Sequence, residues 1–293
     1  MSDTTSQIVI EGDVAFVTGA ASGFGLALSN ELVSRGACVI MVDIDENGCK
    51  KAADELNAKT GKNVAIAVKA DTTVFEEQLA AYELGKEVFG RVDYFFANAG
   101  LAERPWIPPF SPSTSSIHPI TKPNLRTLDV DLNGQLNTAA LALQVFERQE
   151  PNSRNGFRGK LVLTASVVGY YAVKSGPLYS AAKAGIVHFM RSAAEYYEDK
   201  GVTVNAISPN VTVTALTTQE ILSLFNQEDL CSIDFVVEQM ISVLGSCKDN
   251  GRAISITGKT VWDNPPDTHM RDQVWPVLSI GDDATGKAFG LWQ

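Results

Sequence analysis

The sequence predicts an α/β fold, a doubly wound parallel sheet of about seven strands with helices on both faces. Three observations support this prediction. Short, continuous apolar runs alternate with longer segments of helical spacing, which is typical of parallel strands that helices cover on both sides. A glycine-rich turn follows the first apolar run. No linker interrupts the alternation, so we expect a single domain over residues 1–293.

The predicted elements follow one another in a regular order. The apolar runs predict strands at Val14–Gly19, Cys38–Asp43, Asn63–Asp71, Val92–Gly100, Gly159–Ser166, Val202–Pro209 and Ala253–Gly258. Helical spacing predicts helices over residues 23–35, 45–60 and 73–89. A further helix is expected to begin near Pro177, because proline suits a first helical turn.

Four segments depart from this alternation. Residues 1–9 are expected to be a flexible N-terminus. Residues 101–123 form a Pro/Ser-rich loop and residues 212–232 a short amphipathic lid, and we expect both near the substrate site, since long irregular segments are usually functional or disordered. The C-terminal tail, residues 259–293, either caps the site or forms an oligomer interface; it carries Trp262, Trp275 and Trp292 without clear periodicity.

Composition argues against several classes of protein. The net charge is −10, and a chain this acidic is repelled by the phosphate backbone of nucleic acids. No apolar run reaches the length of about 18 residues that spans a membrane. The first ten residues, MSDTTSQIVI, lack the features of a secretory signal. The four cysteines form no CxxC pair and the three histidines have no metal-ligand spacing. We therefore expect a cytoplasmic protein with reduced thiols and no metal.

The turn TGAASGFG, residues 18–25, joins the first strand to the first helix. Its glycines fall at Gly19, Gly23 and Gly25. Glycine permits a tight turn and lets backbone N–H groups approach a pyrophosphate at the positive end of a helix. The predicted strand before the turn and the helix after it provide the context that a dinucleotide site requires. The alternative is a tight turn that binds no ligand.

Asp43 ends the second predicted strand, and its carboxylate can accept both ribose hydroxyls of an adenosine while repelling a 2′-phosphate. No Arg or Lys stands in the glycine turn or directly after Asp43, so the sequence favours NAD over NADP; a solvated acid at a strand end is the alternative. Asp71 closes the third strand, where it can bond adenine. The small residues Asn98–Gly100 close the fourth and leave room for the middle of the cofactor.

Tyr179 and Lys183 lie one turn apart on the predicted helix, among small Ala, Ser and Gly residues. A free tyrosine is a poor base near neutral pH, because its pKa is about 10. A neighbouring ammonium stabilises the phenolate, so the pair can exchange a proton with an alcohol or a carbonyl. The small side chains around the pair leave space for a cofactor and a substrate. An unremarkable helix that happens to carry both residues is the alternative.

Two further polar residues are expected beside this pair. Ser166 ends the fifth predicted strand, where its hydroxyl faces the crevice and can polarise a carbonyl oxygen. Asn133 lies in a predicted helix beside the fourth strand. A buried asparagine there needs hydrogen-bond partners, and it can hold a water molecule that connects Lys183 to solvent.

Taken together, the sequence resembles the short-chain dehydrogenase/reductase family, in its single-domain branch, over about residues 10–260. The resemblance rests on the glycine turn, Asp71, the NAG motif at residues 98–100, Asn133, Ser166, and Tyr179 with Lys183. It implies a Rossmann-type fold and a homodimer or homotetramer formed through helices at residues 124–150 and 177–200. A further similarity, to fungal and 15-hydroxyprostaglandin-dehydrogenase-like members, favours an NAD-dependent alcohol oxidiser of secondary metabolism.

The resemblance also implies a role for each site residue. Tyr179 is the general acid/base, Lys183 tunes it and binds the nicotinamide ribose, Ser166 positions the substrate oxygen, and Asn133 holds a relay water. Thr214 contacts the carboxamide. The cofactor site is expected to comprise Gly19, Ser22, Gly23, Phe24, Gly25, Asp43, Ile44, Asp71, Thr72, Asn98, Ala99, Gly100, Tyr179, Lys183, Pro209, Val211 and Thr214.

The chain departs from the family pattern at two places. Asn210 follows Pro209 where the family has glycine, and asparagine tolerates left-handed backbone, so the turn can survive. The usual C-terminal Asp-Gly-Gly is replaced by DNPP at residues 263–266, which puts the usual tetramer contacts in question.

The sequence therefore predicts an NAD(H)-dependent oxidoreductase that interconverts a secondary alcohol and a ketone. Apolar residues of the loop and the lid favour a bulky, largely apolar substrate such as a polycyclic, terpenoid or steroid-like alcohol; they are Trp106, Ile107, Phe110, Leu216, Ile221, Leu222, Leu224 and Phe225. Packing against one another or against a partner subunit is the alternative for these side chains. Two other hypotheses for the function are a non-redox enzyme, such as an isomerase, cyclase or dehydratase, and an NAD-binding protein without catalytic turnover.

Overall fold

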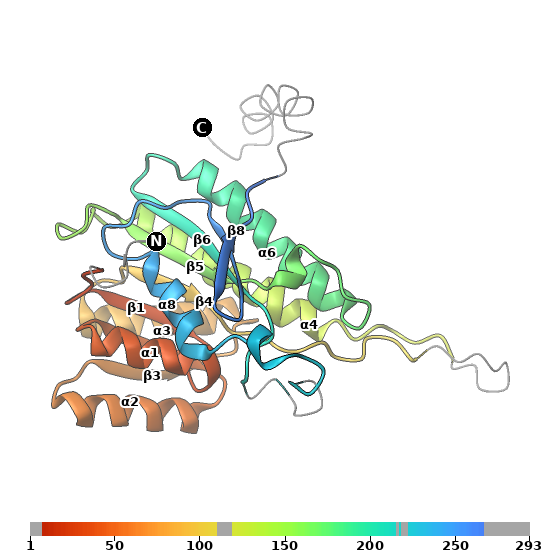
Figure 1. Ribbon diagram of the computed structural model, residues 1–293. Helices are drawn as coiled ribbons and strands as arrows, with labels where there is room; N and C mark the ends of the chain where they lie inside the picture. Colours follow the sequence, from red (N-terminus) through yellow and green to blue (C-terminus); the bar gives the residue numbers. More distant parts are fainter. Residues whose placement is uncertain (1–7, 110–118, 215–216, 218–221, 267–293) are drawn as a thin grey trace, which may run out of the picture. The chain divides into compact units, whose positions relative to one another are not determined.

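The computed structural model describes residues 8–109, 119–214, 217 and 222–266 (Figure 1). An eight-stranded sheet runs in the order β3-β2-β1-β4-β5-β6-β7-β8. Seven strands are parallel, and they are β1 (Val14–Thr18), β2 (Cys38–Asp43), β3 (Ala65–Lys69), β4 (Tyr94–Ala97), β5 (Gly159–Thr164), β6 (Val202–Pro209) and β7 (Ala253–Thr257). The doubly wound α/β prediction is confirmed.

The eighth strand is a difference from the predicted count of about seven. β8 (Thr260–Asp263) pairs antiparallel with β7 across a tight turn at Gly258 and Lys259. It escaped prediction because it is a short edge strand whose side chains are mostly exposed, so it has no apolar run. The first part of the predicted tail is therefore a strand, whereas Trp275 and Trp292 lie outside the described residues.

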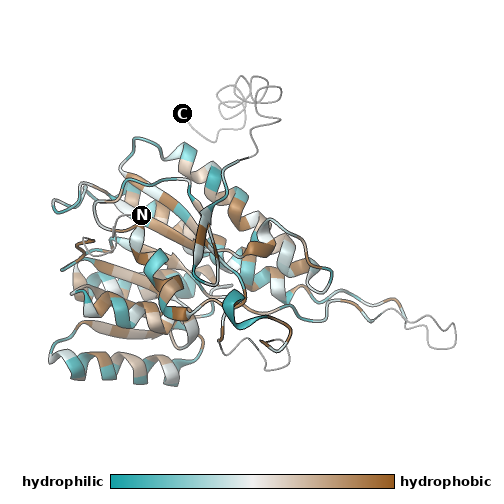
Figure 2. Ribbon diagram, viewed as in Figure 1, coloured by the Kyte–Doolittle hydropathy of each residue, from teal (hydrophilic) through white to brown (hydrophobic). Residues whose placement is uncertain are grey.

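Helices cover both faces of the sheet, as Figure 1 shows. On one face, α1 (Gly23–Ser34), α2 (Glu46–Thr60) and α8 (Ile233–Ser242) contribute to one apolar cluster. On the other, α3 (Phe75–Phe89), α5 (Gln135–Glu147) and α6 (Pro177–Tyr196) contribute to a second cluster. Figure 2 shows that the central strands between them are mostly apolar. Two buried faces explain why the strands are continuous apolar runs rather than alternating ones.

The helix that leads into α5 is irregular. A single α-turn, α4 (Arg126–Leu128), passes into a π-helical segment, η3 (Asp129–Gly134), before α5 begins. π-Helical turns are rare and frequently mark functional sites. Two short 3₁₀ turns, η4 (Val167–Gly169) and η5 (Gln227–Asp229), complete the described elements.

The chain separates by contacts into two units, Met1–Asp263 and Asn264–Gln293. The single-domain organisation over residues 1–293 stays a prediction. Within the described residues, no helix is both long enough and apolar enough to cross a membrane.

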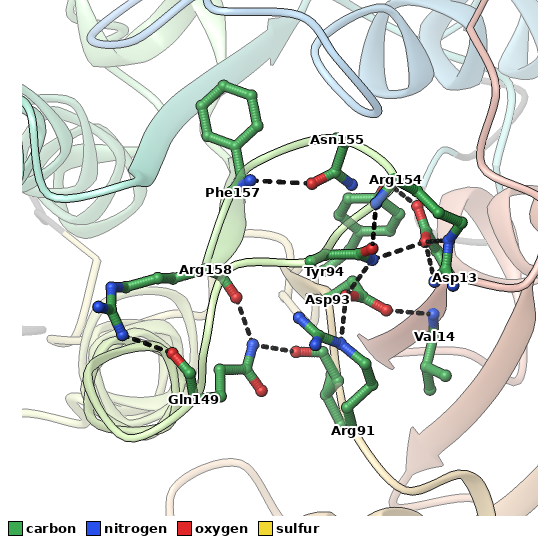
Figure 3. Close-up of polar contacts among 12 residues, drawn as sticks. Asp13, Val14, Arg91, Asp93, Tyr94, Gln149, Arg154, Asn155, Phe157 and Arg158 are labelled. Atoms are coloured by element: carbon green, nitrogen blue, oxygen red, sulfur yellow. Dashed lines mark hydrogen bonds and ion pairs between the residues drawn. The ribbon is translucent and has the colours of Figure 1, made fainter.

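A buried polar network lies at the amino edge of the sheet, opposite to the ends where the parallel strands finish (Figure 3). Asp13 is 1% exposed, and its carboxylate accepts hydrogen bonds from the Tyr94 hydroxyl, from Asn152 Nδ2 at 2.9 Å and from Arg154 Nε at 2.9 Å. Asn152 Nδ2 also donates to Asp93 at 2.8 Å. Burial, and then the charge of Asp13, raise the pKa of Tyr94. The network joins β1 and β4 to the segment that precedes β5.

We predict that Asp13→Ala destabilises the chain by about 3 kcal/mol, because it leaves the buried donors of Tyr94 and Asn152 without their acceptor. The free energy of unfolding in urea measures the loss. Lys51→Ala is the control, because Lys51 forms only an exposed ion pair with Glu55 at 4.0 Å, and it should change stability by less than about 0.5 kcal/mol. An equal loss of unfolding free energy in the two variants would contradict the stabilising role of the buried network.

Candidate active site

A cavity of about 570 Å³ lies along the carboxyl edge of the sheet. Its wall comes from the ends of β1 to β6 and the segments that follow them, together with residues of α4, η3 and α6. The predicted site residues that line it are Gly19, Ser22, Gly23, Phe24, Asp43, Ile44, Asp71, Thr72, Asn98, Ala99, Gly100, Ser166, Tyr179, Lys183, Pro209, Val211 and Thr214. Two predicted residues, Gly25 and Asn133, are not part of this wall.

The glycine turn forms one end of the cavity. Gly19 has a φ of +68°, and a Cβ atom on Gly25 would lie 2.1 Å from the carbonyl oxygen of Gly19. Because Gly25 has no side chain, the Gly19 carbonyl can pack this closely against it. Ser22 is the N-cap residue of α1, and its side chain forms no capping hydrogen bond. The N–H groups of the first turn thus remain available to an anionic group, so the turn fits a pyrophosphate.

Asp43 lies at the rim of the cavity, next to the exposed side chain of Ile44. One of its oxygens accepts the N–H of Ala21 and the other accepts the N–H of Asp45, each at 2.9 Å. These bonds fix the carboxylate beside the glycine turn. Each oxygen keeps a second lone pair for a ligand hydroxyl.

Asp71 carries more local interactions than the sequence indicated. Its Oδ1 accepts both the N–H and the hydroxyl of Thr73, and its Oδ2 pairs with Arg126 Nη2 at 3.2 Å. Burial alone raises the pKa of Asp71, but the bonds from Thr73 and Arg126 outweigh it and leave that pKa below its usual value. Arg126 and Lys183 are the cationic residues of the described cavity wall.

Thr18, which the sequence did not single out, holds the NAG motif in place. Its hydroxyl donates to the carbonyl of Phe96 and accepts the N–H groups of Asn98 and Ala99 at 2.9 and 3.1 Å. Asn98 Nδ2 returns a bond to the carbonyl of Thr18 at 2.9 Å. The ends of the neighbouring strands β1 and β4 are therefore tied together next to Gly19 and Asn98, which line the cavity.

Lys183 is 3% exposed and lines the cavity. Its Nζ donates to the carbonyl of Thr164 at 3.0 Å and lies 5.4 Å from the centre of the Tyr179 ring. Thr164 is the last residue of β5, and its hydroxyl donates to Asn98 Oδ1 at 3.2 Å. The structure therefore brings the predicted tyrosine and lysine together at the end of a central strand.

Ser166 follows β5 into the same cavity. Its hydroxyl donates to the carbonyl of Pro209 at 3.2 Å and accepts the N–H of Val168 at 3.4 Å. Both bonds are long, so a ligand oxygen can replace one of them at small cost. Ser166 and Tyr179 thus offer two hydroxyl groups to one space.

The expectation that Asn133 is buried is wrong. Asn133 is exposed and does not line the cavity, whereas Asp131, two residues earlier, is fully buried. The buried side of this segment carries Thr127, Asp131, Gln135 and Thr138 at three- to four-residue spacing. That spacing is a signal in the sequence that could have identified Asp131 as the inward-facing residue.

Glu103 is a second residue that the sequence analysis missed. It lines the cavity from the segment after β4, and its Oε2 accepts the N–H of Tyr179 at 2.7 Å. It therefore caps the first turn of α6 from another part of the chain. A single acid in a proline-rich loop carries no local pattern, so no sequence signal could have identified it.

The turn after β6 survives without left-handed backbone. Among the described non-glycine residues only Asp199 has a positive φ, so Asn210 does not use the conformation that we expected of it. Instead, its N–H donates to the carbonyl of Ile256 at 2.8 Å and its Nδ2 donates to the Thr257 hydroxyl at 3.2 Å. Asn210 thereby joins the end of β6 to β7.

The predicted apolar loop and lid residues lie elsewhere than expected. Of those that the structure describes, none lines the cavity; they are Trp106, Ile107, Leu222, Leu224 and Phe225. Phe110, Leu216 and Ile221 lie outside the described residues. Apolar residues that do line the cavity include Leu101, Val167, Val168 and Val173.

Comparison with known proteins places this geometry in context. A family model for the short chain dehydrogenases matches residues 13–222. The short-chain dehydrogenase/reductase prx7 of Penicillium rubens is 30% identical over 236 residues, which are 80% of each chain. The 3-hydroxyacyl-CoA dehydrogenase type-2 of Rattus norvegicus is 32% identical over 209 residues, 71% of this chain and 77% of that protein.

Two solved structures share the fold. They are a 3-ketoacyl-(acyl-carrier-protein) reductase from Brucella melitensis complexed with NADH and a short chain dehydrogenase from Burkholderia cenocepacia in complex with NADP. Each has a TM-score of 0.69 at 23% sequence identity and covers 85% of this chain and 98% of its own. At this identity the likeness supports the fold alone.

We predict that Glu103→Ala weakens the first turn of α6. Loss of a charge-assisted hydrogen bond costs about 1.5–3 kcal/mol, so amide exchange at Tyr179 should accelerate by roughly ten- to a hundredfold. Glu103→Gln keeps an oxygen acceptor and should retain most of the protection. Hydrogen exchange at this amide measures both variants, and unchanged exchange in Glu103→Ala would contradict the capping role.

Proposed function

The chain belongs to the short-chain dehydrogenase family, and on this premise we propose that it is an NAD-dependent oxidoreductase that interconverts a secondary alcohol and a ketone. The observation that carries the proposal is the pairing of Tyr179 with Lys183, whose Nζ lies 5.4 Å from the tyrosine ring within the cavity wall. The family supplies the nicotinamide cofactor and the redox class. The choice of NAD, the alcohol and the role of each residue are proposals.

The cavity fits a dinucleotide along its length. The uncapped first turn of α1 would hold the pyrophosphate, Asp43 the adenosine ribose, and Asn98–Gly100 the middle of the molecule. Lys183 would bind the nicotinamide ribose and Thr214 the carboxamide. When bound, the cofactor accepts or returns a hydride at its nicotinamide ring.

The chain's own residues then handle the oxygen and the proton. Ser166 holds the substrate oxygen through its hydroxyl. Tyr179 as phenolate takes the alcohol proton during oxidation, and as phenol it returns a proton during reduction. Lys183 keeps its ammonium near the phenol because the Thr164 carbonyl anchors it at 3.0 Å.

Asp43 supports NAD rather than NADP. The carboxylate at the end of β2 would accept ribose hydroxyls and repel a 2′-phosphate. Its two oxygens are held by backbone N–H groups, so it cannot easily swing away. The nearby cation, Arg126, is paired with Asp71.

The substrate that we propose is a bulky, largely apolar secondary alcohol such as a polycyclic natural product, a terpenoid or a steroid-like compound. Leu101 and the three valines of the cavity wall support an apolar contact with the substrate. The name of the rat relative specifies a 3-hydroxyacyl thioester, which is itself a secondary alcohol and supports the reaction class. A cytoplasmic location, a homodimer or homotetramer, and a place in secondary metabolism are part of the same proposal.

The test is to mix the protein with NAD and a panel of cyclic secondary alcohols and to follow nicotinamide reduction by absorbance.

We predict that Tyr179→Phe lowers kcat by about 10²–10⁴-fold, the usual contribution of a general acid/base, without loss of NAD binding. Tyr171→Phe is the matched control, because Tyr171 is 68% exposed and does not line the cavity. Tight NAD binding without turnover of any alcohol would instead favour the hypothesis of a non-catalytic NAD-binding protein. A product whose mass equals that of the substrate would favour the hypothesis of an isomerase.

We predict that Asp43→Ala reduces the preference for NAD over NADP by at least about tenfold, because the ribose loses its acceptor and the 2′-phosphate loses its repulsion. Calorimetric affinities for the two dinucleotides measure the change. Asp45→Ala is a suitable control, since Asp45 is an N-cap residue of α2 that does not line the cavity. An unchanged ratio of affinities in Asp43→Ala would refute the NAD assignment.

A further inference from the structure

Glu103 places a carboxylate with unused acceptor capacity in the wall of the cavity. Its Oε2 accepts the N–H of Tyr179 at 2.7 Å, whereas its Oε1 is buried and has no hydrogen-bond partner among the described residues. An ionised carboxylate has about four lone-pair sites, so most of the capacity of this group is open. A buried carboxylate oxygen without a partner is costly, and such a group calls for an explanation.

The other two carboxylates of the described cavity wall are already held by the chain. Asp43 accepts one N–H on each of its oxygens, and Asp71 accepts Thr73 on one oxygen and Arg126 on the other. Glu103 forms no ion pair with any cation that the structure describes. It is therefore the carboxylate of this wall that the chain itself satisfies least, which marks it as a contact for a ligand.

The backbone around Glu103 is anchored on both sides. The N–H of Leu101 donates to Asp131 Oδ1 at 2.6 Å, and the N–H of Arg104 donates to the Thr127 hydroxyl at 3.2 Å. These two bonds tie the segment after β4 to α4 and η3, so Glu103 stays in the wall. The terminal torsion of a glutamate is soft, and the carboxylate can turn an oxygen towards a ligand without any movement of the chain.

Glu103 lies at the same end of the cavity as Tyr179. A Cβ atom on Gly176 would lie 3.7 Å from Glu103 Oε2 and 3.4 Å from Val173 Cγ2, so the carboxylate lies beside the segment that leads into α6. Val173, Gly176 and Tyr179 all line the cavity. Glu103 is thus a polar group in a partly apolar wall near the reacting centre, and such groups fix the orientation of a bound ligand.

The charges in this region favour a neutral hydrogen-bond donor. Burial raises the pKa of Asp131, Lys183 lowers it and Glu103 raises it further, so Lys183 and Glu103 lie in one neighbourhood. A carboxylate accepts hydrogen bonds and repels anions. A cationic group on the substrate would be repelled by Lys183 and, during oxidation, by the positive nicotinamide ring of NAD. A hydroxyl group supplies the donor without either charge.

We propose that the substrate is a diol, whose second hydroxyl group, on an otherwise apolar skeleton, donates to the Glu103 carboxylate while the first reacts at Tyr179. This inference rests on the proposed function and names its substrate class. No bond forms or breaks at the second hydroxyl, so Glu103 is a specificity-determining residue. An alcohol without that hydroxyl leaves the carboxylate unpaired, which is how a polar site rejects an analogue.

The first experiment compares substrates on one rigid polycyclic skeleton, a secondary mono-alcohol and diols with the second hydroxyl at successive ring positions. We expect kcat/KM to be about ten- to a hundredfold higher for the best diol, the usual effect of a hydrogen bond to a charged group. In Glu103→Ala this ratio should fall to about one. The weakening of α6 in that variant affects both substrates alike and cancels in the ratio.

Two results of this comparison would overturn the proposal. One is an equal kcat/KM for the mono-alcohol and every diol in the wild type. The other is an amino alcohol that the wild type oxidises better than the matching diol, since the second group would then be a cation.

Glu103→Gln tests the direction of the hydrogen bond. The amide oxygen can still accept the N–H of Tyr179, and the NH₂ group, which donates, then takes the place of Oε1. The preference for the diol should disappear, and an analogue with a ketone oxygen at the same ring position should become the better substrate. Glu87→Gln is the matched control, because Glu87 is an exposed residue of α3 outside the cavity, and it should keep the wild-type ratio. A diol preference that survives in Glu103→Gln would contradict the proposal.

Binding without turnover separates this inference from the proposed function. Tertiary alcohols carry no hydrogen on the carbinol carbon, so they cannot give a hydride. Calorimetry of the full chain with NAD present should show that a tertiary diol binds at least about tenfold tighter than the tertiary mono-alcohol, and that Glu103→Ala removes the difference. That result without oxidation of any secondary alcohol would overturn the redox function and support the recognition by Glu103. Oxidation of alcohols with equal affinities for the tertiary pair would overturn the diol inference alone.

Discussion

The hydrogen bond from the Lys183 ammonium to the carbonyl oxygen of Thr164 is the contact on which the rest of the site depends. Thr164 ends β5, and its carbonyl is also bonded by Gln135 Nε2 from α5 at 3.0 Å. One strand end therefore anchors two helices. Since Tyr179 lies one turn before Lys183 on α6, its position follows from the same anchor, and Glu103 holds the start of that helix from the other side.

The two edges of the sheet have different chemistry for a physical reason. At the amino edge, two buried aspartates are saturated by donors from Tyr94, Asn152 and arginines, so this network is rigid and closed. At the carboxyl edge, the first turn of α1 is uncapped and Asp131 Oδ2 has no partner among the described residues. Unsatisfied groups at this edge cost stability, and they are the groups that a ligand or a proton can satisfy.

The sequence predicted most of the fold because its signals are local. β2 and β6 match their predicted bounds, since continuous apolar runs and flanking turns define them. β8 could not be predicted, because its pairing with β7 rather than its own composition makes it a strand. Within the site, Tyr179 and Lys183 were found from their spacing. Glu103 was not, because its contact with α6 joins segments far apart in the chain. Asn133 was expected to be buried but is exposed, because the buried side of that helix, at three- to four-residue spacing, carries Asp131 instead.

A crystal structure of the chain with bound NAD tests the central claim most directly, because that claim is a matter of position. Our account predicts the adenosine ribose against Asp43, and the nicotinamide ring between Ser166 and Tyr179, with the phenol oxygen close enough to share a proton with a substrate oxygen on that ring. A dinucleotide bound in the cavity with Tyr179 turned away from the nicotinamide, or bound somewhere other than this cavity, would contradict the account.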